Sequence, residues 1–265
     1  ITPPISITSA VEGLRKLPRF SDLETNTIVI IVLVIISAFF FTQQFGTSKI
    51  GKLFGPFMAV WFSMLGILGL IHISDDISIL HALNPYYAIH FLITYEEGFW
   101  LLGAVFLCTT GAEALYSDLG HCGRGNIRIS WIFVKICLLL NYFGQGASLL
   151  SLHGGKLVDK ATRNADNINA FYDLMPSWFV APGVIIATSA AVIASQAMVS
   201  GSYTLINEAI RLNLWPRLRT RYPSEEKGQI YIPGINLMLF IGCIIVVLYF
   251  RESSRMEAAY GLAII

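Results

Sequence analysis

Charged residues are scarce in this sequence. Asp, Glu, Lys and Arg together make up 13% of its 265 residues, whereas a soluble domain carries about a quarter. Apolar residues account for 55%, and the mean hydropathy is +0.64. The few charges gather between long uncharged runs, which indicates an integral membrane protein. The formal net charge of +1 gives no reason to expect a nucleic-acid partner.

Motifs for catalysis and metal binding are also lacking. The four cysteines lie in or beside apolar runs without C-x-x-C spacing, which favours small apolar side chains in helices over metal or redox sites. The five histidines are scattered and show no ligand spacing. Neither H-E-x-x-H nor G-x-S-x-G occurs. We therefore expect no enzyme and no cofactor.

Long apolar runs dominate what is present. A helix needs about 20 mostly apolar residues to cross about 30 Å of hydrocarbon, and five runs meet this reasonably well, while a sixth is interrupted and a seventh is cut short. Membrane β-strands would alternate apolar and polar residues, and no such pattern appears, so we predict an all-α membrane protein. The chain lacks an initial Met and stops inside an apolar run, so we expect residues 1–265 to be part of one transmembrane domain. The predicted membrane segments are 27–41, 53–71, 98–116 (interrupted), 129–150, 178–204, 231–250 and 258–265 (truncated).

The connecting segments differ in their basic residues. Segment 73–97 contains four acids and no Lys or Arg, whereas segment 205–230 contains four Arg and one Lys. Cytoplasmic loops of membrane proteins carry the excess of Lys and Arg. We therefore predict that loops 42–52, 117–128 and 205–230 lie on the cytoplasmic side of the plasma membrane.

Small residues crowd one run, ATSAAVIASQAMVSGS. Residues spaced four apart in a helix share a face, and small ones let two helix backbones approach closely. The run continues into a stretch that is polar on one side, so we expect the helix to extend past the bilayer and to end before Pro216 and Pro223. The small pairs are Ala187/Ala191, Ala190/Ala194 and Ala197/Gly201.

The interrupted segment contains the strongest candidate site. Its purely apolar part, 99–108, is too short to cross alone, and Thr109, Thr110, Gly111 and Glu113 follow it. Gly and Thr weaken a helix and free backbone carbonyls, and transporters offer such carbonyls to cations. Potassium suits a shell of carbonyl and hydroxyl oxygens with few full charges. We predict a cation site at these four residues.

Glu113 is the acid of this segment. An acid within a membrane segment is costly and marks an ion path or a proton relay. Burial favours its protonated form and a bound cation favours its ionised form, so one carboxylate links proton binding to cation binding. The alternative is that Glu113 lies near the cytoplasmic end of the segment and reaches water there.

Polar residues also occur around the following run. Lys135 either extends along apolar surface to the cytoplasm or pairs with a carboxylate. Asn141, Tyr142 and Gln145 fall within about one helical turn, and we favour hydrogen bonds to neighbouring helices over contact with the ion. Together with Tyr116, these three are candidate outer contacts of the cation site.

Nine stretches stand out along the chain: ITPPISITSAVEGL, GKLFGPFM, HALNPYYAIHFL, GAEALYSDLGH, IRISW, LNYFGQGASLL, VIASQAMVSGSYTLINEAIRL, GQIYIPGINLML and AAYGLAI. These stretches resemble the KUP/HAK/KT family of potassium transporters. They fall in family order and cover nearly the whole chain, so together they are specific although each alone is modest. The family's first helix with its GDIGTSPLY-type motif, its acid of helix three and its cytoplasmic C-terminal region have no counterpart here.

The resemblance implies a LeuT-like fold of two inverted five-helix repeats, within the amino acid–polyamine–organocation superfamily. The chain would cover helices four to nine and the start of ten, with the interrupted segment as helix six. Potassium would be imported with protons, and the family's acid and hydroxyl of helix six fall on Glu113 and Thr110. The ion site would be shared with missing helices. A homodimer of the complete protein in the lipid bilayer is compatible with the resemblance.

Other functions remain open at this point. An amino acid permease of the same fold would place a substrate carboxylate where Glu113 repels it. A passive channel would conduct potassium without needing a titrating acid. A structural or enzymatic membrane protein lacks any supporting motif. A secondary transporter that imports potassium by proton symport is the leading hypothesis.

Overall fold

The regular structure of the chain is helical. The computed structural model describes residues 1–17, 19–45, 48–95, 98, 102, 103, 105, 124–153, 169–222 and 230–264. Within these ranges the only β pairing is one isolated bridge between Arg221 and Tyr231. The prediction of an all-α membrane protein is therefore confirmed for the described part of the chain.

Among the described residues, five helices are long and apolar enough to cross a membrane. Each overlaps a predicted run. Most extend beyond it, because the runs were bounded by their apolar residues and the helices also include polar residues at their ends. Segment 98–116 lies almost entirely outside the described residues. The five helices are α2 (Thr25–Thr42), α3 (Ser48–His72), α7 (Arg124–His153), α8 (Val180–Arg211) and α9 (Pro233–Phe250).

Helix α8 extends beyond the thickness of the bilayer. Its 32 residues span about 48 Å at 1.5 Å per residue, compared with about 30 Å of hydrocarbon. The helix ends at Arg211, and Asn213 then adopts a left-handed conformation with φ of 57°. The predicted helix that continues beyond the apolar run and ends before Pro216 and Pro223 is confirmed in its bounds, and its extension past the bilayer stays a prediction.

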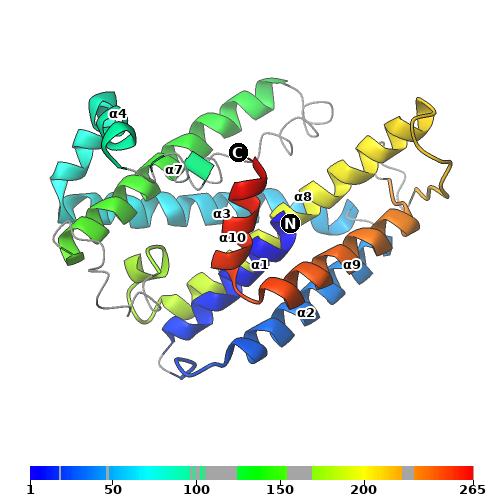
Figure 1. The fold of residues 1–265 in the computed structure, drawn as a ribbon, viewed down its shortest axis with the longest axis horizontal. Coiled ribbons are helices and arrows are strands. Elements are labelled where there is room, and N and C mark those ends of the chain that lie inside the picture. Colours follow the sequence, from blue (N-terminus) through cyan, green and yellow to red (C-terminus); the bar gives the residue numbers. More distant parts are fainter. Residues whose placement is uncertain are drawn as a thin grey trace.

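Two shorter helices pack among the long ones. Helix α1 (Thr2–Glu12, dark blue in Figure 1) lies against α2 (blue), α8 (yellow), α9 (orange) and α10 (Ser253–Ile264, red). Prolines at the start of α1 are compatible with its first turn, where the amide hydrogens need no helical partner. Hydropathy alone did not predict α1, because its 11 residues are too few and too polar. The start of α10 lies five residues before predicted segment 258–265.

Predicted external segment 73–97 also contains helical structure. Two 3-10 helices, Ile73–Asp75 and Ile77–Leu83, precede α4 (Pro85–Thr94). The second 3-10 helix is capped by the Asp76 carboxylate, and α4 by the Asn84 side chain. These caps explain why short helices form in a segment without a long apolar run.

The core has two parts. Every third or fourth residue of α2 faces α1, α8 and α9, as expected for a helix packed on one side. A second cluster joins α1, α3 and the start of α8 around Tyr172. The first part is centred on Ile7, Val11, Ile28, Val32, Ile36, Tyr203, Ile232, Val247 and Met256.

Helices approach one another through small residues in two places. Ala187 and Ala190 of α8 are buried where α8 packs on α1, whereas Ala194, the partner of Ala190, is exposed, so the predicted packing holds for part of the small pairs. The second place, between α3 and α7, was not predicted. A Cβ built on Gly69 would lie 2.3 Å from the carbonyl oxygen of Leu140, and one on Gly144 would lie 2.5 Å from the Cα of Gly69. Here the two backbones touch.

Candidate functional site

The predicted cation site lies outside the described residues. Of the residues expected to form or surround it, the structure describes those on α7. The described candidates for a site are therefore the polar residues of α7 and the cavity between α1, α3 and α8. The predicted residues not described are Thr109, Thr110, Gly111, Glu113 and Tyr116.

Asn141 lies inside the helix bundle. Its side chain is 4% exposed, and it follows Leu140 at the contact with Gly69 of α3. Among the described residues, no donor reaches its buried Oδ1. An unsatisfied buried oxygen costs about 1–3 kcal/mol, so this atom is suited to accept a donor or a cation. The expected hydrogen bond to a neighbouring helix stays a prediction.

Tyr142 and Gln145 take different positions from Asn141. The buried residues of α7 are Cys137, Asn141, Gly144, Ala147 and Ser148, which lie along one side of the helix. Tyr142 is 43% exposed, and Gln145 is half-buried. The three polar residues therefore differ in exposure, and Asn141 is the buried one, next to Gly69 of α3.

Lys135 lies one turn along α7 from Trp131, on an exposed part of the helix. Its Nζ lies 5.3 Å from the centroid of the Trp131 ring, a distance at which an aromatic face attracts an ammonium group. Trp131 is nearer the predicted cytoplasmic end of α7. The geometry agrees with a side chain that extends toward the cytoplasm.

A cavity of about 490 Å³ lies between α1, α3, α8 and the residues just before α8. Its walls are mostly apolar, with Trp61 on one side and the alanines of α8 on the other. Four polar side chains reach it, which is the composition of a small-ligand site. They are Ser6, Ser9, Asn169 and Glu257.

These polar residues were not predicted as site residues. Ser6 and Ser9 are three residues apart, so they share a face of α1. This spacing indicates a shared face only in a helix, and α1 was not predicted. Glu257 directly precedes the predicted seventh membrane segment and was assigned to a loop. Hydroxyl oxygens with one carboxylate suit a monovalent cation or a proton. The described residues include no group of three or more His, Cys, Asp or Glu that could hold a metal ion.

Hydrogen bonds between distant elements hold the cavity walls. The Glu12 carboxylate accepts the backbone N–H of Ser253 at 3.0 Å and also its hydroxyl, so the end of α1 caps the start of α10. The Tyr172 hydroxyl donates to the carbonyl oxygen of Ala10 at 2.9 Å. Burial, followed by the charge of Glu12, raises the pKa of Tyr172. Helices α1 and α10 are thereby fixed to each other, and α1 to the loop before α8.

Comparison with known proteins identifies related sequences. A family model described as the K+ potassium transporter integral membrane domain matches residues 1–265. The chain is 60% identical over its whole length to a protein named probable potassium transport system protein Kup from Flavobacterium psychrophilum, of which it covers 39%. Proteins of the same printed name from Cytophaga hutchinsonii and Clostridium perfringens are 59% and 56% identical over the whole chain, which covers 39% and 40% of them.

The match covers only part of each relative. The chain spans about two-fifths of the length of these curated relatives. No solved structure matches the chain.

Proposed function

Because the chain belongs to the K+ potassium transporter family, we propose that the protein of which it forms part imports potassium across the plasma membrane. The family is one of transporters rather than enzymes. Five helices able to span a membrane make the chain part of an integral membrane protein. The family match over all of residues 1–265 is the observation that carries this proposal.

Coupling to protons is the finer part of the proposal. Glu113 is an acid within a segment that begins with ten apolar residues. In that position it exchanges a proton for a cation, while Thr109, Thr110 and the backbone near Gly111 supply neutral oxygens. Potassium and the proton are the transported substrates, and the mechanism requires no cofactor.

We also propose a LeuT-like arrangement of two inverted repeats for the complete protein. In that arrangement broken helices place their backbone carbonyls near the middle of the membrane. In this proposal the cavity beside α1 faces the same region, with Ser6, Ser9 and Glu257 as its polar groups on two helices fixed to each other by Glu12. A homodimer of the complete protein is part of this proposal.

Rubidium uptake tests the proposed function. The complete protein is reconstituted in proteoliposomes, and uptake is measured with and without an inward proton gradient for wild type and Glu113→Gln. We expect the gradient to drive uptake in wild type and the substitution to abolish that dependence. Glu252→Gln, which changes an exposed acid paired with Arg255, is the matched control and should behave as wild type.

The two main alternatives give different results. Equal wild-type uptake with and without the gradient would contradict proton symport and favour a channel. Uptake of an amino acid in place of rubidium would identify a permease. If rubidium uptake by Glu113→Gln still depended on the proton gradient, another acid would couple protons to transport. Glu257 would then be the next residue to change.

A further inference from the structure

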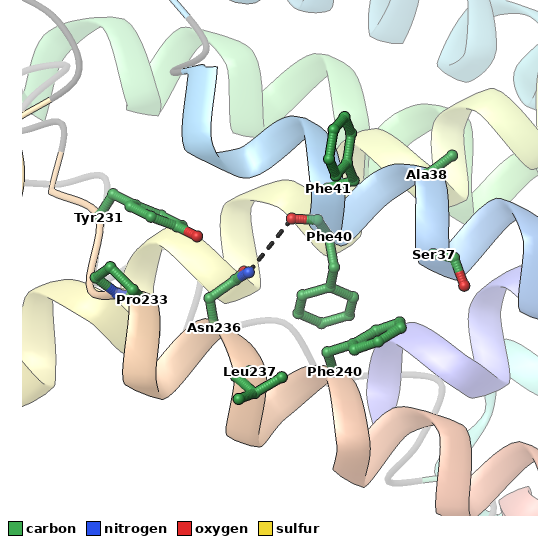
Figure 2. A pocket seen from close by; sticks show the side chains of 9 residues that line it. All are labelled: Ser37, Ala38, Phe40, Phe41, Tyr231, Pro233, Asn236, Leu237 and Phe240. Carbon is green, nitrogen blue, oxygen red and sulfur yellow. Dashed lines mark hydrogen bonds between the residues drawn. The ribbon is translucent and has the colours of Figure 1, made fainter.

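A second hollow lies on the outside of the bundle, between α2 and α9. It is an open groove of about 650 Å³. Figure 2 shows the rings of Phe40 and Phe240 facing each other along it, with Tyr231 at one end and Ser37 at the other. The lining residues are Ser37, Ala38, Phe40, Phe41, Tyr231, Pro233, Asn236, Leu237 and Phe240.

The side-chain amide of Asn236 in the groove already has partners within the protein. Asn236 accepts a hydrogen bond from the Tyr203 hydroxyl at 2.6 Å and donates one to the carbonyl oxygen of Phe40 at 3.3 Å (Figure 2). The rings of Phe40 and Phe240 are 5.6 Å apart and line the middle of the groove. What the groove offers an occupant is therefore mainly apolar surface.

The edges of the groove are exposed in the described part of the chain. Phe41 and Leu237 on its two edges are 64% and 57% exposed, and both belong to helices able to span the membrane. Around such helices the surrounding solvent is hydrocarbon rather than water. An acyl chain is the apolar group available at that depth.

Positive charge lies at one end of the groove. Tyr231 pairs with Arg221 through two backbone hydrogen bonds of 2.8 and 2.9 Å. Arg221 follows Arg219 and Arg217, and all three side chains are exposed. The basic-residue pattern predicts that this segment is cytoplasmic, and the cytoplasmic leaflet is rich in anionic lipids that attract basic residues near the membrane.

We propose that this groove binds one anionic phospholipid of the cytoplasmic leaflet. One acyl chain lies against Phe40 and Phe240, and the phosphate meets Arg219 and Arg221. Arginine suits this role because its planar guanidinium binds phosphate with two hydrogen bonds. The proposal does not depend on proton coupling.

Lipid retention on the complete protein tests this proposal. The protein is purified from vesicles of equal phosphatidylglycerol and phosphatidylcholine, and the lipids that remain bound are counted by native mass spectrometry. We expect wild type to retain phosphatidylglycerol preferentially. The double variant Arg219→Gln/Arg221→Gln should lose about tenfold or more of that preference, since each basic residue contributes about 1 kcal/mol near an anionic surface.

A second variant tests the acyl-chain part of the site. Ala38→Trp fills the groove from its exposed edge, so it should reduce retention of both lipids without disturbing the core. Arg211→Gln and Ile245→Trp are the matched controls, because they make the same kinds of change at exposed positions away from the groove lining. Both should retain lipid as wild type does.

Three results would overturn the proposal. The first is an unchanged preference in the double arginine variant. The second is wild-type retention in Ala38→Trp. The third is a change of oligomeric state in Ala38→Trp, which would show that a second protein copy, and not a lipid, covers the groove.

Discussion

Glycines set the distance between α3 and α7, and three of them in α3 meet different surroundings. A Cβ on Gly55 would meet no atom within 4 Å. One on Gly66 would lie 3.1 Å from the sulfur of Cys137, and one on Gly69 would lie within 2.5 Å of three backbone atoms of Leu140 and Asn141. Sulfur at the end of a side chain can shift, whereas helix backbone cannot without moving the helix.

Substitution of these glycines by alanine should therefore give a graded series. We expect Gly69→Ala to lower the free energy of unfolding by about 1–3 kcal/mol, as overpacking does. Gly55→Ala should leave it unchanged or raise it by up to about 1 kcal/mol, because alanine favours helix. Gly66→Ala should fall between them. Thermal unfolding of the complete protein in detergent measures the series, and equal midpoints for all three would refute the contact.

Tyr172 gives a prediction about pH. Its buried hydroxyl donates to Ala10, and burial raises its pKa above the usual value. The folded state thus keeps the proton while the unfolded chain releases it above about pH 10. The contribution of Tyr172 to stability is therefore complete below pH 10 and is lost as the pH rises toward the raised value.

We expect Tyr172→Phe to lower the free energy of unfolding at pH 8 by about 1 kcal/mol, because one hydrogen bond is lost. The variant should therefore unfold at a lower temperature than wild type. The difference should shrink between pH 10 and 11, since phenylalanine does not titrate. Tyr222→Phe, at an exposed position outside the membrane helices, is the control. A wild-type advantage that stays constant up to pH 11 would contradict the argument.

At the scale of elements, α10 depends on α1 for its start. Ser253 lies at the first position of α10, and its N–H and hydroxyl both bind the Glu12 carboxylate. Hydrogen bonds to a charged group contribute about 1.5–3 kcal/mol. We expect Glu12→Ala to cost about 1–3 kcal/mol and to speed amide hydrogen exchange in α10.

Glu252 is the matched control for that change. It precedes Ser253 but forms an exposed pair with Arg255, and such pairs contribute little. Glu252→Ala should change stability by less than about 1 kcal/mol and leave exchange in α10 as in wild type. Equal effects of the two substitutions would show that Glu12 does not cap α10.

The apolar runs predicted α2, α3, α7, α8 and α9 because each of these helices contains no charged residue over most of its length. They did not predict α1, whose burial comes from tertiary packing and not from its own hydropathy. The Glu12–Ser253 contact joins residues 241 apart, and no local pattern relates them. The close contact at Gly69 was missed for the same reason, since its partners lie on another helix.

At the scale of the whole molecule, the candidate site is only partly predictable. Glu113 stands out in the sequence because an acid is rare in an apolar segment, and its role stays a prediction. Ser6, Ser9 and Glu257 do not stand out, since hydroxyls and helix-end acids are common. The structure brings them to one cavity because α1 and α10 are held together.

The orientation of the molecule is the remaining whole-chain prediction. The absence of Lys and Arg from segment 73–97, and their number in 205–230, predict that Ser74 is external and Tyr222 cytoplasmic. Single cysteines at these two exposed positions test it, in a complete protein whose native cysteines have been replaced. A thiol reagent that does not cross membranes should label Ser74→Cys on intact cells and Tyr222→Cys only after permeabilisation.

The opposite labelling would show that the molecule has the inverted orientation in the membrane. Arg219 and Arg221 would then face the outer leaflet, and Lys135 would extend toward the exterior. The groove between α2 and α9 would keep its apolar lining and its positive end, since neither depends on direction. Its phospholipid would have to come from the outer leaflet. Lipid retention together with cysteine labelling therefore determines both the ligand and the leaflet that supplies it.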